Sequence, residues 1–132
     1  MMKIQETRSL EETLNEYVKF LDMTSSELLV AIPDSDIGLY SNQKLKDAFE
    51  AGEKRGVKVR VLSNQKTRIG LPGHQYEAGL VLSNHYAVSD RKCVFMGVVG
   101  NFENGLFAYE SLTFVPEHMA MFEHTPILTV VS

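Results

Sequence analysis

The side chains best suited to chemistry are four histidines, which could bind a metal ion or transfer protons. His118 and His124 are six residues apart and project from different sides of one predicted helix, so they make poor joint ligands. His74 and His85 could meet only if the loop that carries His74 folds back over a sheet. A phosphodiesterase or nuclease with a site rebuilt from His74, His85 and Asp90 is therefore one hypothesis, and no metal site is predicted.

Sequence motifs for cofactor binding and acyl transfer are missing from the chain. It contains no G-x-x-x-x-G-K-[ST] loop, no dinucleotide fingerprint and no G-x-S-x-G elbow. We therefore expect no cofactor.

The most informative stretch runs from Ser83 to Gly100, SNHYAVSDRKCVFMGVVG. Its layout resembles the signature of the phospholipase D superfamily, in which His-x-Lys precedes four residues and an Asp on a β-hairpin, and a Gly-Ser pair begins seven residues later. Asp90 and Gly97 stand at the matching spacing. The flanking segments LLVAIP, GVKVRVLSN and NGLFAYESLTFVPEHMAMFEH extend the resemblance. It implies one α/β domain over residues 1–132, with a phospholipase-D-like mixed sheet flanked by helices.

The departures from this signature bear on catalysis. In that family the histidine is the covalent nucleophile toward a phosphodiester, and the lysine stabilises the phosphate charge. Ser83 and His85 occupy these positions here, and Val98 replaces the serine of the Gly-Ser pair. A serine without an adjacent base is a weak nucleophile, and a histidine carries no permanent charge at neutral pH. The chain is therefore predicted not to be an enzyme.

Without the catalytic residues, the chain resembles the effector-binding domain of archaeal sugar-responsive transcription regulators of the TrmB type. This resemblance implies a non-catalytic ligand-sensing or regulatory domain, homodimeric, that binds a small polar ligand or a protein partner. Those regulators carry a winged-helix DNA-binding domain ahead of the sensing domain, and none is visible here. No direct nucleic-acid binding by this domain is expected. A third hypothesis is a protein-interaction module that uses the strand Ile127 to Val131 as an edge.

A ligand site can be placed from topology. In open α/β sheets, ligands occupy the crevice beyond the carboxyl ends of the parallel strands. Small polar residues follow two predicted strands, and the degenerate signature brings further ones to the same neighbourhood. The alternative for the residues after the strands is that they only form turns. The predicted ligand-binding residues are Asp34, Ser63, Asn64, Ser83, His85 and Asp90.

The elements that position these residues follow from periodicity. Ser9 and Glu12 form a capping box, after which apolar residues recur at helical spacing to Leu21. The apolar run from Glu27 to Ile32 predicts a strand covered on both faces. A second helix, capped by Ser41 and ended by Gly56, leads to a strand with Val57, Val59 and Val61. The order strand, helix, strand predicts a parallel crossover.

The second half of the chain is predicted to be richer in strands. Residues 67–77 lack periodicity and predict a long loop. Strands are expected at residues 78–82, 86–88, 93–99, 105–109 and 127–131, with a turn at Asp90 and Arg91 and a short helix from Pro116 to Phe122.

Composition limits the possible partners. The chain has 132 residues, 44% of them hydrophobic, which suits one domain, and its formal net charge of -4 disfavours a protein that grips phosphate backbones. Lysines and arginines concentrate between Lys44 and Arg68, where interleaved acidic residues favour a solvated helix face over a binding surface. With Cys93 as the only cysteine, no intramolecular disulfide forms, which suits the cytoplasm. No membrane contact is expected.

Overall fold

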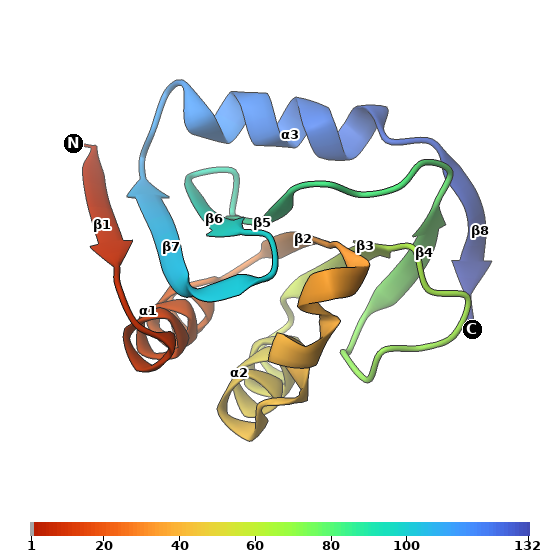
Figure 1. The fold of residues 1–132 in the computed structure, drawn as a ribbon, viewed down its shortest axis with the longest axis horizontal. Helices are drawn as coiled ribbons and strands as arrows, with labels where there is room; N and C mark the ends of the chain where they lie inside the picture. The colour runs from red at the N-terminus through yellow and green to blue at the C-terminus, as the bar shows by residue number, and fades with distance from the viewer. Residues whose placement is uncertain (1) are drawn as a thin grey trace.

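An eight-stranded mixed sheet forms the centre of the molecule (Figure 1). The computed structural model describes residues 2–132, and the strand order is β1-β7-β6-β5-β2-β3-β4-β8. The strands are β1 (Lys3–Thr7), β2 (Glu27–Ile32), β3 (Lys58–Ser63), β4 (His74–Ala78), β5 (His85–Ser89), β6 (Cys93–Val98), β7 (Asn101–Tyr109) and β8 (Ile127–Val131).

The centre of the sheet is a parallel unit. β2 pairs in parallel with β3, and β3 pairs in parallel with β4, as the predicted crossover requires. On its other side β2 pairs with β5 in the antiparallel sense, and β5, β6 and β7 form an antiparallel meander. All residues of β2 after Glu27 are buried, which explains its continuous apolar sequence.

Helices cover both faces of the sheet (Figure 1). On one face lie α1 (Leu10–Asp22), α2 (Gln43–Lys54) and the 3-10 helix η1 (Asp34–Ser41). On the other face lies α3 (Phe114–His124) alone. The chain thus forms an α/β domain with a mixed sheet flanked by helices.

The larger core lies under α1 and α2 and is rich in aromatic residues. The Tyr17 ring centroid is 4.6 Å from that of Phe95, which stacks on Phe107 at 4.7 Å. Phe20 and Phe49 complete the cluster, and all five side chains are at most 1% exposed. Burying each such side chain stabilises the fold by about 1.5–3 kcal/mol. A smaller core under α3 includes Leu29, Ala31, Leu62, Val94, Met119 and Phe122.

The first helix begins as predicted and the second does not. The Ser9 hydroxyl accepts a hydrogen bond from the Glu12 N–H at 3.1 Å, so the predicted cap at Ser9 is confirmed. The Glu12 carboxylate accepts from the Arg8 N–H at 2.8 Å instead of the Ser9 N–H, so the capping box is only half formed. The predicted cap at Ser41 is wrong, because Ser41 ends η1, and Asn42 caps α2 by accepting from the N–H groups of Lys44 and Leu45. The 3-10 helix delays the start of α2 by one residue.

Two strands differ from the prediction for a common physical reason. The strand expected at residues 78–82 lies at His74–Ala78, inside the predicted loop, and β1 was not predicted. Both have polar sequences, HQYEA and KIQET, because they lie at or next to a sheet edge. The apolar residues Leu80 and Val81, which suggested a strand, are 48% and 85% exposed.

The last two elements are found where the sequence placed them. α3 starts two residues before Pro116, which therefore sits in the first turn, where a helix needs no N–H donor. β8 is the terminal strand and lies at the sheet edge beside β4. Within residues 2–132, no helix has both the length and the apolar character to cross a membrane.

Candidate functional site at the carboxyl ends of the parallel strands

With the exception of Asp90, the predicted ligand-binding residues gather at the end of the sheet where the parallel strands β2 and β3 terminate. β2 and β3 end side by side, since Ile32 pairs with Ser63. β5 begins at this same end because it runs antiparallel to β2, with Tyr86 opposite Ala31. Asp34, Ser63, Asn64, Ser83 and His85 therefore lie near one another, at the ends of β2 and β3 and the start of β5.

His85 is enclosed in the core rather than presented to a ligand. Its residue exposure is 3%, and both ring nitrogens have partners. Nδ1 lies 2.8 Å from Oδ2 of Asp36, and Nε2 lies 2.6 Å from the Tyr40 hydroxyl. The Tyr40 hydroxyl lies in turn 2.7 Å from the Tyr17 hydroxyl. Asp36, His85, Tyr40 and Tyr17 thus form a buried polar chain that links η1, β5 and α1.

Sequence reasoning missed two members of this polar chain, Tyr40 and Asp36. Asp36 is the charged one. It sits in η1 with no solvent exposure, and Oδ1 accepts hydrogen bonds from the Gly100 N–H at 2.5 Å and the Ser35 hydroxyl at 3.0 Å. Burial alone would raise the pKa of Asp36, but the His85 contact and the Gly100 N–H outweigh it and lower the pKa. The carboxylate is therefore charged at neutral pH. An Asp shortly after a strand and its Pro is a weak signal that could have drawn attention to it.

The two tyrosines of the buried chain stay protonated. Burial raises the pKa of Tyr17, and burial together with the neighbouring Tyr17 raises the pKa of Tyr40 well above its ordinary value. Neutral hydroxyls both donate and accept hydrogen bonds, so the polar groups of this buried chain can all be paired with one another without water.

The residues that follow the parallel strands form turns and hold neighbouring segments. The Asn64 amide donates to the Leu80 carbonyl at 2.7 Å, and its oxygen accepts from the Leu82 N–H at 2.9 Å. The Ser63 hydroxyl accepts from the Gln65 N–H, and Asp34 accepts from the Gln65 side chain at 2.9 Å. These contacts favour the alternative in which such residues serve local structure, and Asn64 fixes the segment that leads to Ser83.

Beside that segment lies a small hollow between β5 and the carboxyl-terminal end of α3. Its volume is about 210 Å³, and we call it the Ser83 hollow. Its apolar lining includes Leu82 and Met121, and its polar lining includes Ser83, Asn84, Tyr86 and His124. The side chains of Ser83, Asn84 and His124 make no hydrogen bond with any residue in 2–132, so they are available to a ligand.

Tyr86 is the unusual member of the lining. The residue is 3% exposed, and its ring lies edge-on to the ring of His118 at a centroid distance of 5.1 Å. Its hydroxyl has no hydrogen-bond partner in the described part of the chain. Burial raises the pKa of Tyr86, so the hydroxyl remains a neutral donor. Because Tyr86 lines the hollow and its hydroxyl is not among the fully buried unpaired atoms, water or a ligand in the hollow can serve as its partner.

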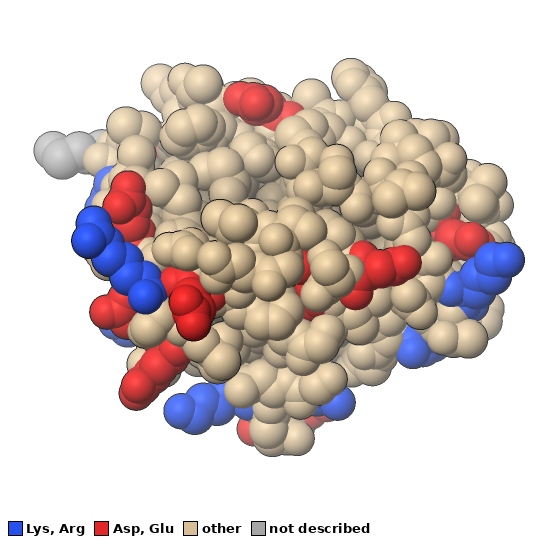
Figure 2. Space-filling model, in the orientation of Figure 1, with Lys and Arg blue, Asp and Glu red and all other residues tan. Residues whose placement is uncertain are grey.

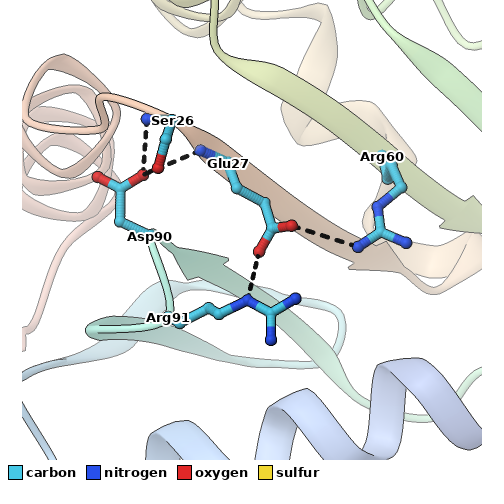
Figure 3. A network of polar contacts seen from close by, with 5 residues as sticks. All are labelled: Ser26, Glu27, Arg60, Asp90 and Arg91. Atoms are coloured by element: carbon cyan, nitrogen blue, oxygen red, sulfur yellow. Dashed lines mark hydrogen bonds and ion pairs between the residues drawn. The ribbon is translucent and has the colours of Figure 1, made fainter.

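Asp90 lies at the opposite end of these strands, where β5 ends and β2 begins. There it stabilises a turn (Figure 3). It follows β5 in a hairpin with φ of 53°, and its carboxylate accepts from the N–H groups of Ser25, Ser26 and Glu27 at 2.8–2.9 Å. Burial alone would raise the pKa of Asp90, but these backbone donors lower it to about 2. Asp90 thus ties the β5–β6 hairpin to the start of β2, away from the other predicted residues.

Next to Asp90, Glu27 bridges two arginines (Figure 3). Its carboxylate lies 3.2 Å from Nε of Arg91 and 3.4 Å from the Arg60 guanidinium. His74 lies nearby, exposed, opposite Arg60 at the start of β4. His74 in β4 and Asp90 after β5 are separated by β3 and β2. His85 lies at the other end of β5 from Asp90, so the hypothetical site of His74, His85 and Asp90 does not assemble.

The remaining histidines do not form a metal site either. His118 is buried with Nδ1 2.7 Å from the Phe114 carbonyl, whereas His124 is exposed at the end of α3. Among residues 2–132, no group of three or more His, Cys, Asp or Glu side chains could hold a metal ion.

Comparisons with known proteins connect this geometry to a fold. No protein-family model matches the sequence, and no curated protein matches it. Solved structures match over nearly the whole chain. NucT from Helicobacter pylori has a TM-score of 0.72 at 14% identity, with 93% of this chain and 94% of that chain covered. The phospholipase D family member Nuc from Salmonella typhimurium has a TM-score of 0.70 at 12% identity, covering 96% and 98%. The chain has the phospholipase-D-like fold.

A third neighbour is a protein of a different kind. TrmBL2, an archaeal chromatin protein whose structure shows a novel mode of DNA binding, has a TM-score of 0.66 at 16% identity. The match covers 94% of this chain but only 53% of TrmBL2, so the chain spans about half the length of that neighbour. The fold is therefore shared by a phospholipase D family member and by a chromatin protein.

On this phospholipase-D-like fold, the glycine of the signature has a packing role. Gly97 pairs with His85 across β5 and β6. A Cβ at Gly97 would lie 3.1 Å from Nδ1 of His85 and 3.1 Å from Cζ of Phe95. The His85 and Phe95 rings therefore leave little room for a side chain at position 97.

Proposed function

We propose that this domain binds a small neutral polar ligand in the Ser83 hollow, acts in the cytoplasm as a homodimeric regulatory domain, and does not hydrolyse phosphodiesters. The observation that carries the proposal is the hydroxyl of Tyr86, which belongs to a buried side chain, has no partner in the described residues and lines the hollow. Ligand sites characteristically combine apolar walls with a few unsatisfied polar groups.

The lining of the hollow supports a neutral ligand. Its hydrogen-bonding side chains are the hydroxyls of Ser83, Tyr86 and Thr125, the amide of Asn84 and the imidazole of His124, and no Lys, Arg, Asp or Glu lines it. The Thr125 hydroxyl already donates to the Met121 carbonyl. A charged ligand would find no counter-charge there. A volume of about 210 Å³ is below the roughly 300–1,000 Å³ of sites for drug-sized molecules, which favours a small ligand.

The state of the signature residues supports a non-catalytic role. Ser83 makes no hydrogen bond with a histidine that could act as its base, because its side chain has no partner in residues 2–132. Both nitrogens of His85 are engaged, by Asp36 and Tyr40, so this ring is not free to attack phosphorus.

The regulatory context is supported by the likeness to TrmBL2 and by charge. The domain itself is not expected to grip DNA, because its net charge is -4. Figure 2 shows that Lys and Arg do not gather on the displayed face, where the blue side chains lie around the rim and red side chains lie both at the rim and inside it. DNA contacts, where they exist in such regulators, would come from another part of the protein.

The ligand half of the proposal can be tested with three molecules of the same shape and different charge, namely benzamide, benzoate and benzamidine. The probe is the methyl resonance of Met121, which lines the hollow. We expect benzamide to shift this resonance at lower concentration than either charged analogue. Tyr86→Phe should weaken benzamide binding about five- to tenfold, because one hydrogen bond is lost. Tyr109→Phe, which removes a hydroxyl bonded to Glu16 elsewhere, serves as the matched control.

Two results would contradict the proposed ligand site. One is that none of the three molecules shifts the Met121 resonance. The other is that Tyr86→Phe binds benzamide as tightly as the unmutated chain does. The catalytic half is tested separately, and turnover of bis-(4-nitrophenyl) phosphate that is lost in His85→Ala would overturn it.

A further inference from the structure

We infer that β8 pairs with β8 of a second copy, so that two eight-stranded sheets join into one continuous sheet across a two-fold axis. The inference deepens the homodimer included in the proposed function, because it names the surface and the register through which the two copies meet. It stands on the contrast between the two edges of the sheet.

The edge formed by β1 is protected and the edge formed by β8 is not. β1 has the sequence KIQET, with Lys3 and Glu6 exposed. Charged residues of this kind keep edge strands from pairing with other chains. β8 has the sequence ILTVV, with no charge and no proline. An unprotected apolar edge in a sheet whose other edge is protected points to a partner at that edge.

Apolar side chains surround the open edge and extend beyond the strand. Ile127, Leu128 and Val130 are 51%, 68% and 58% exposed. Leu80 and Val81, 48% and 85% exposed, follow β4 in the segment tied to the residue before β8 by a Gly79 N–H to Pro126 carbonyl hydrogen bond. Together these five residues form what we call the β8 edge surface. Adjacent exposed apolar groups of this extent are typical of interaction sites.

A second copy fits this surface better than a charged peptide. The β8 edge surface carries no charge of its own, so it offers nothing that would select a charged partner. Two copies of a chain with net charge -4 repel each other, and they can approach most closely through a surface without charges. The edge of one copy is thus complementary to the edge of another.

The two-fold axis sets the register. Pairing all five residues of β8 places Thr129 opposite Thr129 of the partner subunit, Leu128 opposite the partner's Val130 and Ile127 opposite the partner's Val131. Threonine pairs and pairs of branched aliphatic side chains are favourable across antiparallel strands, and no like charges meet. Any other symmetric register leaves β8 residues unpaired.

Disulfide trapping tests this register directly. Opposite residues in antiparallel strands have Cα atoms about 4.5–5.5 Å apart, which lies within the range for a disulfide. We expect Thr129→Cys to form a covalent dimer on mild oxidation, because Thr129 is exposed and would face its own copy. Gln5→Cys on the β1 edge is the matched control and should stay monomeric. The native cysteine, Cys93, is buried and should not react.

A second variant measures the contribution of the surface. Val130→Lys places a charge on the edge, and we expect it to weaken the dimer at least about tenfold in light scattering across a concentration series. Its circular dichroism should remain that of the unmutated chain, since Val130 is exposed.

The possible outcomes separate this inference from the proposed function. A dimer that survives Val130→Lys and is not trapped at Thr129→Cys pairs through another face, which overturns the inference and leaves the homodimer in place. A chain that is monomeric at every concentration overturns both. Equal trapping at Gln5→Cys also overturns the inference. None of these variants changes a residue that lines the Ser83 hollow, so the Met121 test for a ligand there is a separate measurement.

Discussion

Nδ1 of His85 lies 2.8 Å from Oδ2 of Asp36, and neither side chain is more than 2% exposed. A carboxylate in such surroundings needs partners, since an uncompensated buried charge is strongly destabilising. Asp36 obtains them from His85, from the hydroxyl of Ser35 and from the Gly100 N–H. At the position that matches the lysine of the phospholipase D signature, this chain therefore has a histidine, His85, that contacts the protein's own carboxylate, Asp36.

Replacing this carboxylate should destabilise the fold. We expect Asp36→Asn to lower the free energy of unfolding by about 3 kcal/mol, because His85 and the Gly100 N–H lose a charged partner in the core. The measurement is the midpoint of urea denaturation at unchanged m-value. Asp34→Asn, the same change at an exposed neighbour, should stay within about 0.5 kcal/mol of the unmutated chain. Equal effects of the two changes would contradict the importance of the buried chain.

Asp90 predicts a loss of stability in acid. Its pKa is lowered from 3.8 to about 2 in the folded chain, so the unfolded chain binds the proton more readily. The stabilisation is complete above about pH 4 and is lost as pH falls toward 2. Asp90→Asn cannot titrate, and its stability should fall less steeply across this window. Thermal denaturation of both chains at several pH values makes the comparison, and parallel curves would count against the role of Asp90.

The predictable part of this fold is the part with strong apolar periodicity. The first helix and its cap at Ser9, β2 and the parallel crossover to β3 follow from local sequence patterns. β1 and β4 were missed because strands near an edge tolerate polar residues, which removes the apolar signal. The apolar segment at residues 80–81 misled the prediction for the opposite reason, since it is exposed beside β8 rather than buried.

The positions of the predicted ligand-binding residues in the sheet could be predicted, but their contacts could not. Topology placed Ser63, Asn64, Ser83 and His85 at one end of the strands, and the strand register has them there. The sequence could not show that His85 turns into the core, because that depends on Asp36, a contact made across 49 residues by a 3-10 helix that has no clear sequence pattern. Nor could the sequence show that Asp90 lies at the opposite end of the strands, which follows only from the direction of β5.

Asn64 should control the wall of the Ser83 hollow. Asn64→Ala removes two hydrogen bonds, to the Leu80 carbonyl and from the Leu82 N–H. Since each contributes about 1 kcal/mol, the Leu82 amide should exchange its hydrogen on the order of tenfold faster or more. Gln65→Ala is the matched control, because Gln65 contacts Asp34 instead. Unchanged exchange at Leu82 in Asn64→Ala would show that other contacts hold this segment.

Gly97 should tolerate no side chain. Gly97→Ala would bring a methyl group within 3.1 Å of Nδ1 of His85 and of Cζ of Phe95, both of which are buried. Overpacking of this kind costs about 1–3 kcal/mol in the free energy of unfolding. Gly38→Ala is the control, because no atom lies within 4 Å of a Cβ there and its φ is not positive. Denaturation by urea compares the two, and an equally stable Gly97→Ala would mean that the His85 ring can move aside.

Restoring the catalytic signature alone should not restore catalysis. The double variant Ser83→His and His85→Lys recreates the His-x-Lys pattern, yet the side chain at position 85 points into the core between Asp36 and Tyr40. An ammonium group there would pair with the Asp36 carboxylate instead of a substrate phosphate. We therefore expect no hydrolysis of bis-(4-nitrophenyl) phosphate by the unmutated chain or by the double variant. Adding Asp36→Ala frees the group at position 85, so activity that appears only in this triple variant would identify Asp36 as the residue that keeps the site silent. Activity in the double variant would show instead that Asp36 does not block the position, and that Ser83 and His85 were the only obstacles to phosphodiester chemistry on this fold.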